Sequence, residues 1–349
     1  MSFFYFINQL EKQNETYSEV QMKKIMILST GGTISAYHEN RLDFRNYQSG
    51  YYSGDYILEQ IPEVHQYVDV DVEQIANLSS TLINTEHWLI LREKINTYLN
   101  KDHYDGVVIT HGTNTIEETA YFLNLTVNTN KPIVITGAQR PLSALSSDAP
   151  INLLNAVKVA ASDTSYGKGV LVVLNDQISG ARAVTKTNTY RLETFQSIEQ
   201  GYLGFIDPDD KIVFYQSPVR KHTYLSEFSI MKFKKLPEVD IVYSYAGANG
   251  KVIRSLIESG VKGIVVAGTG AGRCSYEEEK ALEEAAKQGI KIVMSSRYGN
   301  GRVVPLEKYD YLNVITADNL PPHKARILLM VALAKYNEQD RIQDVFHIY

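Results

Sequence analysis

The chain has 349 residues, of which 44% are hydrophobic and 21% are charged. These are ordinary values for a globular protein, so they exclude a largely disordered chain, and the length suits two domains of unequal size. The net charge of −5 argues against nucleic acid or an anionic membrane as a main partner, and no apolar run reaches the roughly 20 residues of a membrane helix.

Residues 1–22 lack hydrophobic periodicity, and we expect them to form an N-terminal extension ahead of the fold proper. The apolar stretch at 3–7 follows no basic residue and is too short for a signal peptide, so a cytoplasmic location is the simplest expectation. Cys274 is the only cysteine, which excludes an intrachain disulfide. No base stands beside it in the sequence, so we expect a structural thiol rather than a nucleophile.

From Lys23 onward, strand-like and helix-like segments alternate. Uninterrupted valine and isoleucine runs between helices are typical of parallel strands that are covered on both faces. Up to residue 210 we expect strands at 25–28, 106–110, 132–136 and 169–175, with helices at 88–99, 115–126 and 148–161. This pattern predicts a larger N-terminal α/β domain over 23–210, with a doubly wound mixed or parallel sheet.

The stretch 211–235 breaks this alternation and contains Pro218 and a basic cluster at 220–222, so we expect an interdomain linker there. Alternation resumes over 236–349, which predicts a smaller C-terminal domain with a parallel sheet. The expected elements are strands at 239–243, 263–267 and 290–295, and helices at 250–259, 276–288 and 322–336, the last closing the chain.

Two predicted strands end in similar glycine-threonine turns, at 30–33 (Thr-Gly-Gly-Thr) and at 110–113 (Thr-His-Gly-Thr). Each places a threonine hydroxyl at the carboxyl end of a parallel strand, where open α/β sheets bind ligands. The structural alternatives are a plain strand-to-helix turn at the first and a helix cap at the second. Exposed backbone donors at the second turn would also suit a carboxylate or a developing oxyanion.

A lysine stands between threonines in the segment 184–189 (Val-Thr-Lys-Thr-Asn-Thr). Lys186 is either a solvated surface charge or a base that activates a threonine hydroxyl. Other chemistries have weaker support. The glycine-rich turn at 268–273 lacks the dinucleotide fingerprint, the eight histidines show no metal-like pairing, and no Gly-x-Ser-x-Gly elbow is present. We therefore expect neither metal nor cofactor.

Taken together, these segments resemble the bacterial-type L-asparaginases, which are two-domain amidohydrolases with threonine nucleophiles. The resemblance runs from about Lys24 to the C-terminus. It is carried by the motifs at 30–34 (TGGTI), 109–113 (ITHGT), 137–141 (GAQRP), 184–189 (VTKTNT), 220–223 (RKHT) and 324–329 (KARILL). It implies hydrolysis of the side-chain amide of L-asparagine to L-aspartate and ammonia through a threonine acyl-enzyme.

The resemblance also implies residue roles. Thr33 matches the nucleophile and Tyr47 the tyrosine that closes over it, while Thr113 and Lys186 match the second threonine and its lysine. Glu307 matches a glutamate lent by a neighbouring subunit, so the resemblance implies shared active sites in a homotetramer built as a dimer of dimers. Ser80 matches the serine that holds the substrate α-carboxylate. The implied substrate-binding residues are Gly32, Ser80, Thr81, Asn114 and the backbone of Ala138.

Three positions depart from the family pattern. Asn114 stands where the family has the aspartate that binds the substrate ammonium, Thr81 replaces a frequent glutamine, and Gly247 replaces a polar side chain from the partner subunit. We expect weakened asparagine hydrolysis and little glutaminase activity. Two alternatives stay open. In the first, the same scaffold acts on another small amide, such as glutamine or D-asparagine. In the second, the chain is a catalytically silent amino-acid-binding protein.

Overall fold

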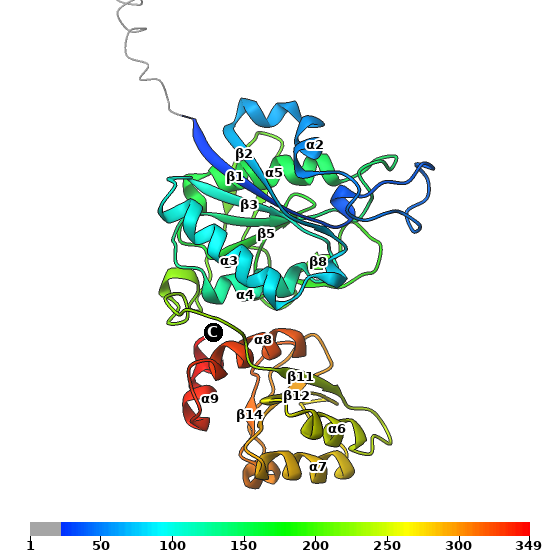
Figure 1. The fold of residues 1–349 in the computed structure, drawn as a ribbon, viewed down its shortest axis with the longest axis vertical. Helices are drawn as coiled ribbons and strands as arrows, with labels where there is room; N and C mark the ends of the chain where they lie inside the picture. The colour runs from blue at the N-terminus through cyan, green and yellow to red at the C-terminus, as the bar shows by residue number, and fades with distance from the viewer. Residues whose placement is uncertain (1–21) are drawn as a thin grey trace, which may run out of the picture.

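The computed structural model describes residues 22–349, so the expected extension lies outside the described residues except for Met22. The chain forms a larger N-terminal and a smaller C-terminal α/β domain, placed one above the other in Figure 1. Among the described residues, no helix has both the length and the apolar character to cross a membrane.

The larger domain is built on an eight-stranded sheet in the order β10-β9-β6-β5-β4-β3-β1-β2. Strands β1 to β5 are parallel neighbours, whereas the pairings that involve β6, β9 and β10 are antiparallel. The strands are β1 (Lys23–Gly31), β2 (Val68–Leu78), β3 (Gly106–Thr110), β4 (Ile133–Thr136), β5 (Val170–Leu174), β6 (Gln177–Gly180), β9 (Gly204–Ile206) and β10 (Ile212–Phe214).

Helices cover both faces of this sheet (Figure 1). On one face, α5 (Ala149–Ala161) packs in the same apolar core as Ile25 and Ile27 of β1. On the other face, α3 (Thr85–Asn100) and α4 (Ile116–Thr126) share a core with Met26 and Leu28. Successive side chains of a strand point to opposite faces, so an uninterrupted apolar run is what a strand covered on both sides requires.

The smaller domain has four parallel strands, β11 (Val239–Tyr243), β12 (Gly263–Gly268), β13 (Lys291–Ser296) and β14 (Ile315–Thr316). Helices α6 (Lys251–Ser259) and α7 (Tyr276–Lys287) share the core on one face, and α8 (Pro322–Leu333) packs on the other. Helix α8 also contacts α4, so one apolar core runs through both domains. The expected fold class, two α/β domains with these two sheets, is confirmed.

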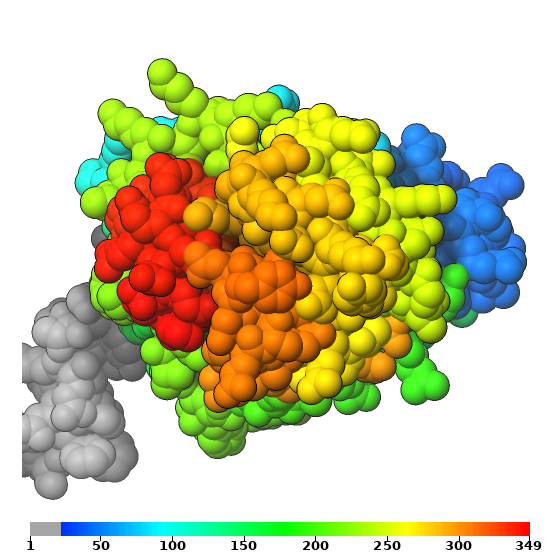
Figure 2. Space-filling view, turned by 90° about the horizontal axis from the view of Figure 1, so that it is seen from below, coloured from blue at the N-terminus to red at the C-terminus, as the bar shows by residue number. Residues whose placement is uncertain are grey.

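Sequence patterns missed several elements, of which three bear on the predicted layout. Strand β2 at the edge of the sheet was not predicted, because the prediction relied on uninterrupted apolar runs and valines alternate with acidic residues here, a pattern typical of a half-buried strand. The stretch expected as a linker begins with β10, which pairs with β9 and belongs to the large sheet. The helix expected over 322–336 ends at Leu333, and α9 (Gln339–Ile348) follows; it lies against β14 and forms the red edge of the molecule in Figure 2.

The remaining elements are short. They are α2 (Gly54–Glu59), β7 (Thr185–Lys186), β8 (Phe195–Gln196) and the 3-10 helices η1 (Thr33–Ser35), η2 (Pro62–Gln66), η3 (Ser80–Leu82), η4 (Asp163–Ser165), η5 (Thr223–Leu225) and η6 (Glu307–Leu312).

Candidate active site

The two glycine-threonine turns leave the same edge of the large sheet. Strands β1 and β3 are parallel neighbours, and Ser29 faces Thr110 in their register. The Thr110 hydroxyl donates to Ser29 Oγ over 3.1 Å, and the Thr30 hydroxyl donates to the Thr110 carbonyl over 2.8 Å. The predicted convergence of both turns at the carboxyl end of the sheet is what the structure shows.

Glycines allow these turns to touch. Gly32 has a φ of 88°, and a Cβ built on it would stand 2.3 Å from the Cα of Gly112. A Cβ on Gly112 would in turn stand 2.7 Å from Ser80 Oγ. Only glycine fits at such distances, because any side chain would force the backbones apart. The close packing brings the start of η3, which carries Ser80, against both turns.

Thr33 follows Gly32 as the first residue of η1 and is 7% exposed. Its Oγ1 lies 3.0 Å from the hydroxyl of Tyr47, in a hydrogen bond in which either group is able to donate. Tyr47 stands on a loop whose ends are joined by two backbone hydrogen bonds between Tyr37 and Gln48, of 3.1 and 2.9 Å. The tyrosine predicted to close over Thr33 therefore contacts it directly.

Thr113 and Lys186 form a second pair. Lys186 lies on β7, which forms a two-stranded antiparallel sheet with β8, and its Nζ donates to Thr113 Oγ1 over 2.8 Å. Burial lowers the pKa of Lys186, and the negative charge of Glu117 opposes part of that effect. A lowered pKa increases the fraction of neutral amine that is able to accept a proton.

Glu117 connects this pair to the smaller domain. Its Oε1 accepts a hydrogen bond from the Lys186 backbone N–H over 3.2 Å, and its Oε2 lies 2.9 Å from Nε2 of His323 and 3.8 Å from Nζ of Lys324. Burial acts to raise the pKa of this carboxyl, but the His323 hydrogen bond and the charges of Lys324 and His323 lower it to about 2. Glu117 is therefore ionised at neutral pH.

Lys324 anchors the segment that precedes Lys186. It is fully buried, and burial lowers its pKa to about 8. Its ammonium group donates to three backbone carbonyls, those of Ala181, Arg182 and Val184. Sequence analysis did not include Glu117, His323 or Lys324 in the site. In the sequence, Glu117 is only a glutamate near the start of the helix predicted over 115–126, and nothing links it to a histidine 206 positions away.

A buried histidine fixes the second turn. His111 Nδ1 lies 2.8 Å from the Gly112 carbonyl, and Nε2 lies 2.9 Å from the Thr119 hydroxyl, which also accepts from Trp88 Nε1 over 2.9 Å. Burial lowers the pKa of His111 to about 4, so the ring is neutral. Because the Gly112 carbonyl only accepts, Nδ1 carries the proton and Nε2 accepts from Thr119.

A hollow of about 580 Å³ opens beside these pairs. Its lining includes Phe44, Tyr47, Thr113, Asn114, Glu117, Gln139 and residues 186–190. Ser80 Oγ and Gln139 Nε2 are buried and have no hydrogen-bond partner within residues 22–349. Gln139 lines the hollow, and Ser80 packs against Gly112, the residue before Thr113 of that lining. Buried polar atoms are normally partnered, so these two atoms indicate groups that a ligand would satisfy.

Of the other predicted residues, some lie at the hollow and others do not. Asn114 is exposed and lines the hollow, and Ala138 is buried just after β4, next to Gln139. Thr81 is exposed, and its hydroxyl lies 3.0 Å from that of Ser79. Glu307 is exposed on η6 of the smaller domain and does not line the hollow of its own chain.

Comparisons with known proteins cover both domains. Residues 24–220 match the family model "Asparaginase, N-terminal", and residues 238–346 match "Glutaminase/Asparaginase C-terminal domain". L-asparaginase 2 of Bacillus subtilis (strain 168) is 44% identical over 328 residues, covering 94% of this chain and 87% of that protein. Glutaminase-asparaginase of Pseudomonas fluorescens biotype A is 39% identical over 341 residues, covering 96% of this chain and 93% of that protein.

A solved structure is similar throughout. The crystal structure of a probable cytoplasmic L-asparaginase from Campylobacter jejuni matches with a TM-score of 0.91 and 42% sequence identity, covering 94% of this chain and all of that one. Both domain models, the relatives and the solved structure point to the same family. The chain therefore belongs to the asparaginase family.

Proposed function

We propose that this protein hydrolyses the side-chain amide of L-asparagine to L-aspartate and ammonia through an ester on Thr33. The observation that carries the proposal is the presence of two buried threonine hydroxyls, each hydrogen-bonded to a second proton-carrying group, beside one polar hollow. A protein that only binds an amino acid has no need of two such pairs. The two relatives, named L-asparaginase and glutaminase-asparaginase, support an amide of this size as the substrate.

In the proposed first step, Thr33 Oγ1 attacks the amide carbon and transfers its proton through the Tyr47 hydroxyl, which lies 3.0 Å away. The tetrahedral intermediate collapses, the C–N bond breaks, and the nitrogen leaves as ammonia after it receives a proton. The product of this step is an aspartyl ester on Thr33. Water then attacks the ester carbon, which releases aspartate and restores the Thr33 hydroxyl.

The second pair serves proton transfer in the same proposal. Lys186 in its neutral form takes the proton of Thr113 while the Thr113 oxygen takes one from the attacking water. The lysine gives that proton up again as the ester bond to Thr33 breaks, so the Thr33 hydroxyl and the neutral amine are both restored. The lowered pKa of Lys186 favours that form, while ionised Glu117 holds the lysine backbone through the 3.2 Å hydrogen bond. No metal and no cofactor takes part in these steps.

Substrate recognition rests on groups that are unpartnered within the described chain. The Ser80 hydroxyl is suited to the α-carboxylate, and Gln139 Nε2 is a further donor near the hollow. The glycine turn at Gly32 and the Ala138 backbone would lie beside the reacting amide. Asn114 offers an oxygen to the α-ammonium without a charge, and a charge-assisted contact is roughly twice as strong as a neutral one. We therefore propose weakened asparagine binding and little glutaminase activity.

We also propose that the active site is shared between subunits. Glu307 is exposed on the smaller domain, away from its own hollow, so it is available to the site of a neighbouring chain in a dimer or tetramer. Thr81 would adjust contacts to the substrate α-groups. The Campylobacter jejuni protein is described as probably cytoplasmic, which supports a cytoplasmic location as a proposal for this chain.

Ammonia release from L-asparagine, L-glutamine and D-asparagine tests the function. We expect clear release from L-asparagine and at least about a thousandfold loss in the Thr33→Ala variant. Release mainly from glutamine or D-asparagine would favour the same scaffold with another amide. Binding of asparagine in calorimetry without ammonia release, in the intact chain and in Asn114→Asp, would instead indicate a silent amino-acid-binding protein.

A further inference from the structure

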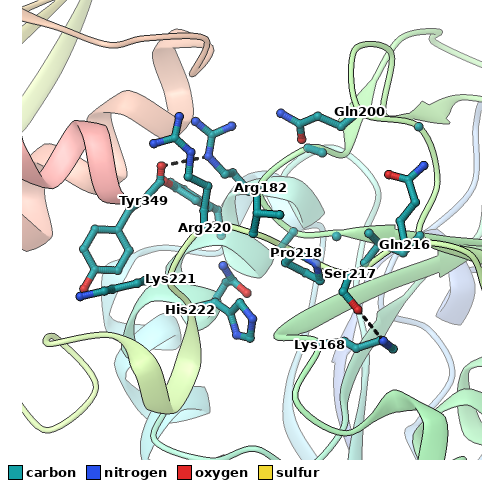
Figure 3. A pocket seen from close by; sticks show the side chains of 18 of the residues that line it. Lys168, Arg182, Gln200, Gln216, Ser217, Pro218, Arg220, Lys221, His222 and Tyr349 are labelled. Atoms are coloured by element: carbon teal, nitrogen blue, oxygen red, sulfur yellow. Dashed lines mark hydrogen bonds between the residues drawn. The ribbon is translucent and has the colours of Figure 1, made fainter.

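A second cavity of about 270 Å³ lies between the two domains (Figure 3). Most of its lining comes from the larger domain and from the connecting segment 216–222, while Asn319 and Tyr349 come from the smaller domain. It has no lining residue in common with the hollow of the candidate active site. Any occupant would therefore be bound apart from the substrate.

The lining of this cavity is strongly basic. It contains no aspartate or glutamate side chain, and its basic residues are Lys168, Arg182, Arg220, Lys221 and His222. Figure 3 shows the guanidinium groups of Arg182 and Arg220 close together at one end of the cavity. Burial lowers the pKa of Arg182, and the neighbouring charge of Arg220 adds to that effect. An anion between these groups would stabilise both charges.

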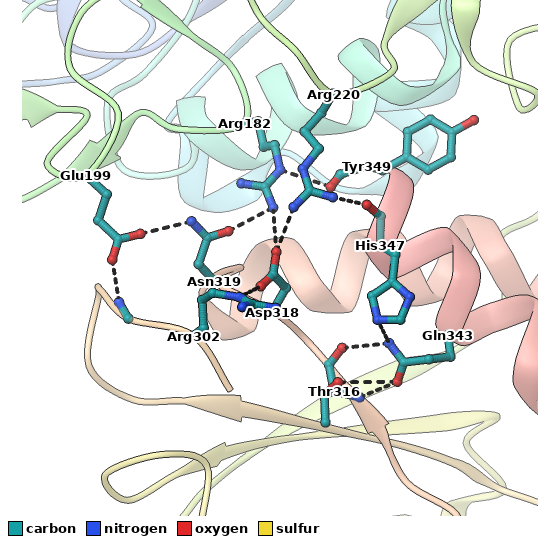
Figure 4. A network of polar contacts seen from close by, with 11 residues as sticks. Arg182, Glu199, Arg220, Arg302, Thr316, Asp318, Asn319, Gln343, His347 and Tyr349 are labelled. Atoms are coloured by element: carbon teal, nitrogen blue, oxygen red, sulfur yellow. Dashed lines mark hydrogen bonds and ion pairs between the residues drawn. The ribbon is translucent and has the colours of Figure 1, made fainter. Parts of the chain in front are cut away.

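Nearby carboxylates leave an excess of positive charge. Three arginines converge on Asp318 in Figure 4: Arg220 at 2.8 Å, Arg302 in direct contact, and Arg182 at 4.0 Å. The other carboxylate in this network, Glu199, accepts from Asn319 and from a backbone N–H rather than from an arginine. One side-chain carboxylate thus faces three guanidinium groups, and the only further acceptor of negative character at Arg182 within residues 22–349 is the terminal oxygen of Tyr349, the last residue of the sequence.

Donors remain free on the cavity side. Arg182 Nε donates to the terminal main-chain oxygen of Tyr349 over 2.9 Å, and Arg182 Nη2 donates to Asn319 Oδ1 over 2.8 Å. Within residues 22–349, Arg182 Nη1 and Arg220 Nε donate to no group, and neither does Nζ of the exposed Lys221, which lies beside the Tyr349 ring in Figure 3. The bonds that are made hold the arginine side chains in place, so the free donors are already oriented for a ligand.

A buried hydroxyl without a partner also belongs to the wall of this cavity. Tyr121 of α4 lines it, the side chain is fully buried, and the Oη has no hydrogen-bond partner among the described residues. Burial raises the pKa of this phenol, so it stays protonated and is a donor. The rest of the lining includes apolar groups, namely Ala181, Leu203, Pro218 and Val219. Apolar walls beside cationic donors suit an organic anion better than a bare inorganic one.

We propose that this cavity binds a small organic anion, with a carboxylate or phosphate group on an apolar or aromatic body. The anionic group lies against Arg182 and Arg220 and accepts from the Tyr121 hydroxyl, the charge of the exposed Lys221 adds to the positive potential at the rim, and the body occupies the apolar part. The volume is just below the roughly 300–1,000 Å³ of pockets for drug-sized ligands, which limits the occupant to a smaller molecule. The occupant would touch both domains and the segment 181–183, a few residues before Lys186.

Calorimetric titration of the full chain tests this site with phenyl phosphate, benzoate and the neutral benzyl alcohol. We expect at least one anion to bind and the alcohol not to bind, and the preferred anion identifies the group as phosphate or carboxylate. Lys221→Gln and Tyr121→Phe should each weaken binding about tenfold, because the first removes a positive charge at the rim and the second a hydrogen bond to the anion. Lys251→Gln, an exposed lysine on α6 without a side-chain partner among the described residues, is the control and should bind normally.

Three results would overturn the proposal. They are the absence of binding by both anions, equal affinity in the intact chain and in both cavity variants, and equal binding of the alcohol. Loss of anion binding in Ser80→Ala, with full binding in Lys221→Gln, would place the anion in the candidate active site instead. Thermal melts of each variant establish that it is folded, and Lys221, being exposed, provides a variant whose folding does not depend on a buried group.

Discussion

Replacing Glu117 by glutamine should destabilise the protein, whereas the same change at the next residue should not. Glu117 is buried, pairs with His323 and lies 3.8 Å from the buried ammonium of Lys324. Its pKa is lowered from 4.5 to about 2. This difference corresponds to about 3 kcal/mol of stability at neutral pH, since each tenfold change in acidity is about 1.4 kcal/mol.

The pH dependence has a definite sign. An acid whose pKa is lower in the folded protein contributes its full stability above the unfolded value and loses it as the pH falls. The free-energy difference between the intact chain and Glu117→Gln should therefore be about 3 kcal/mol at pH 7 and should shrink as the pH falls from 4.5 toward 2. Urea unfolding followed by circular dichroism at several pH values measures this difference.

Glu118 provides the matched control on the same helix turn. Burial raises the pKa of Glu118, so its ionisation opposes folding, and Glu118→Gln should be neutral or slightly stabilising at pH 7. Ammonia release should fall in Glu117→Gln, because the hydrogen bond to the Lys186 backbone loses its charged acceptor. Equal stability of the two variants at pH 7, or a Glu117→Gln deficit that persists unchanged to pH 2, would refute the reasoning.

Three further predictions concern the candidate active site. Asn114→Asp should raise kcat/KM for L-asparagine about 5- to 150-fold in an ammonia assay, because it restores a charge opposite the substrate ammonium; no gain would contradict this account. The intact chain should turn over L-glutamine far more slowly than L-asparagine. Similar rates would show that Thr81 does not restrict the turnover of glutamine. Gly32→Ala should abolish activity and lower the melting temperature, because its Cβ would stand 2.3 Å from Gly112 Cα. Gly247→Ala, with φ of 84° but no atom within 4 Å, should cost only about 1 kcal/mol of backbone strain.

Much of the fold was predictable because its main strands are buried on both faces. The apolar runs of β1, β3, β4 and β12 leave little alternative to a covered parallel sheet, and their bounds agree with expectation to within a few residues. Strand β2 was missed because its apolar residues alternate with polar ones, whereas the prediction relied on uninterrupted apolar runs. Strand β10 has three half-buried residues, too few for a pattern to be recognised.

The candidate site was predictable only in part. The two threonine turns were identifiable because a strand that ends in glycine and threonine has a recognisable local pattern. Lys186 stood out as a lysine between threonines, and the family resemblance supplied Tyr47 and Ser80. The connection from Glu117 to His323 depends on how α8 docks against α4, which no local pattern encodes. The unpartnered state of Ser80 Oγ and Gln139 Nε2 likewise exists only in the folded chain.

Trapping the acyl-enzyme tests the central claim most directly. The purified chain is mixed with L-asparagine, quenched in acid while ammonia is being released, and digested for peptide mass spectrometry. We predict an aspartyl ester on the peptide that contains Thr33, and its absence in the Thr33→Ala variant. Ammonia release with the ester on Thr113 would contradict the assignment of the nucleophile. Steady release with no ester on either threonine, while a known acyl-enzyme survives the same quench, would contradict covalent threonine catalysis.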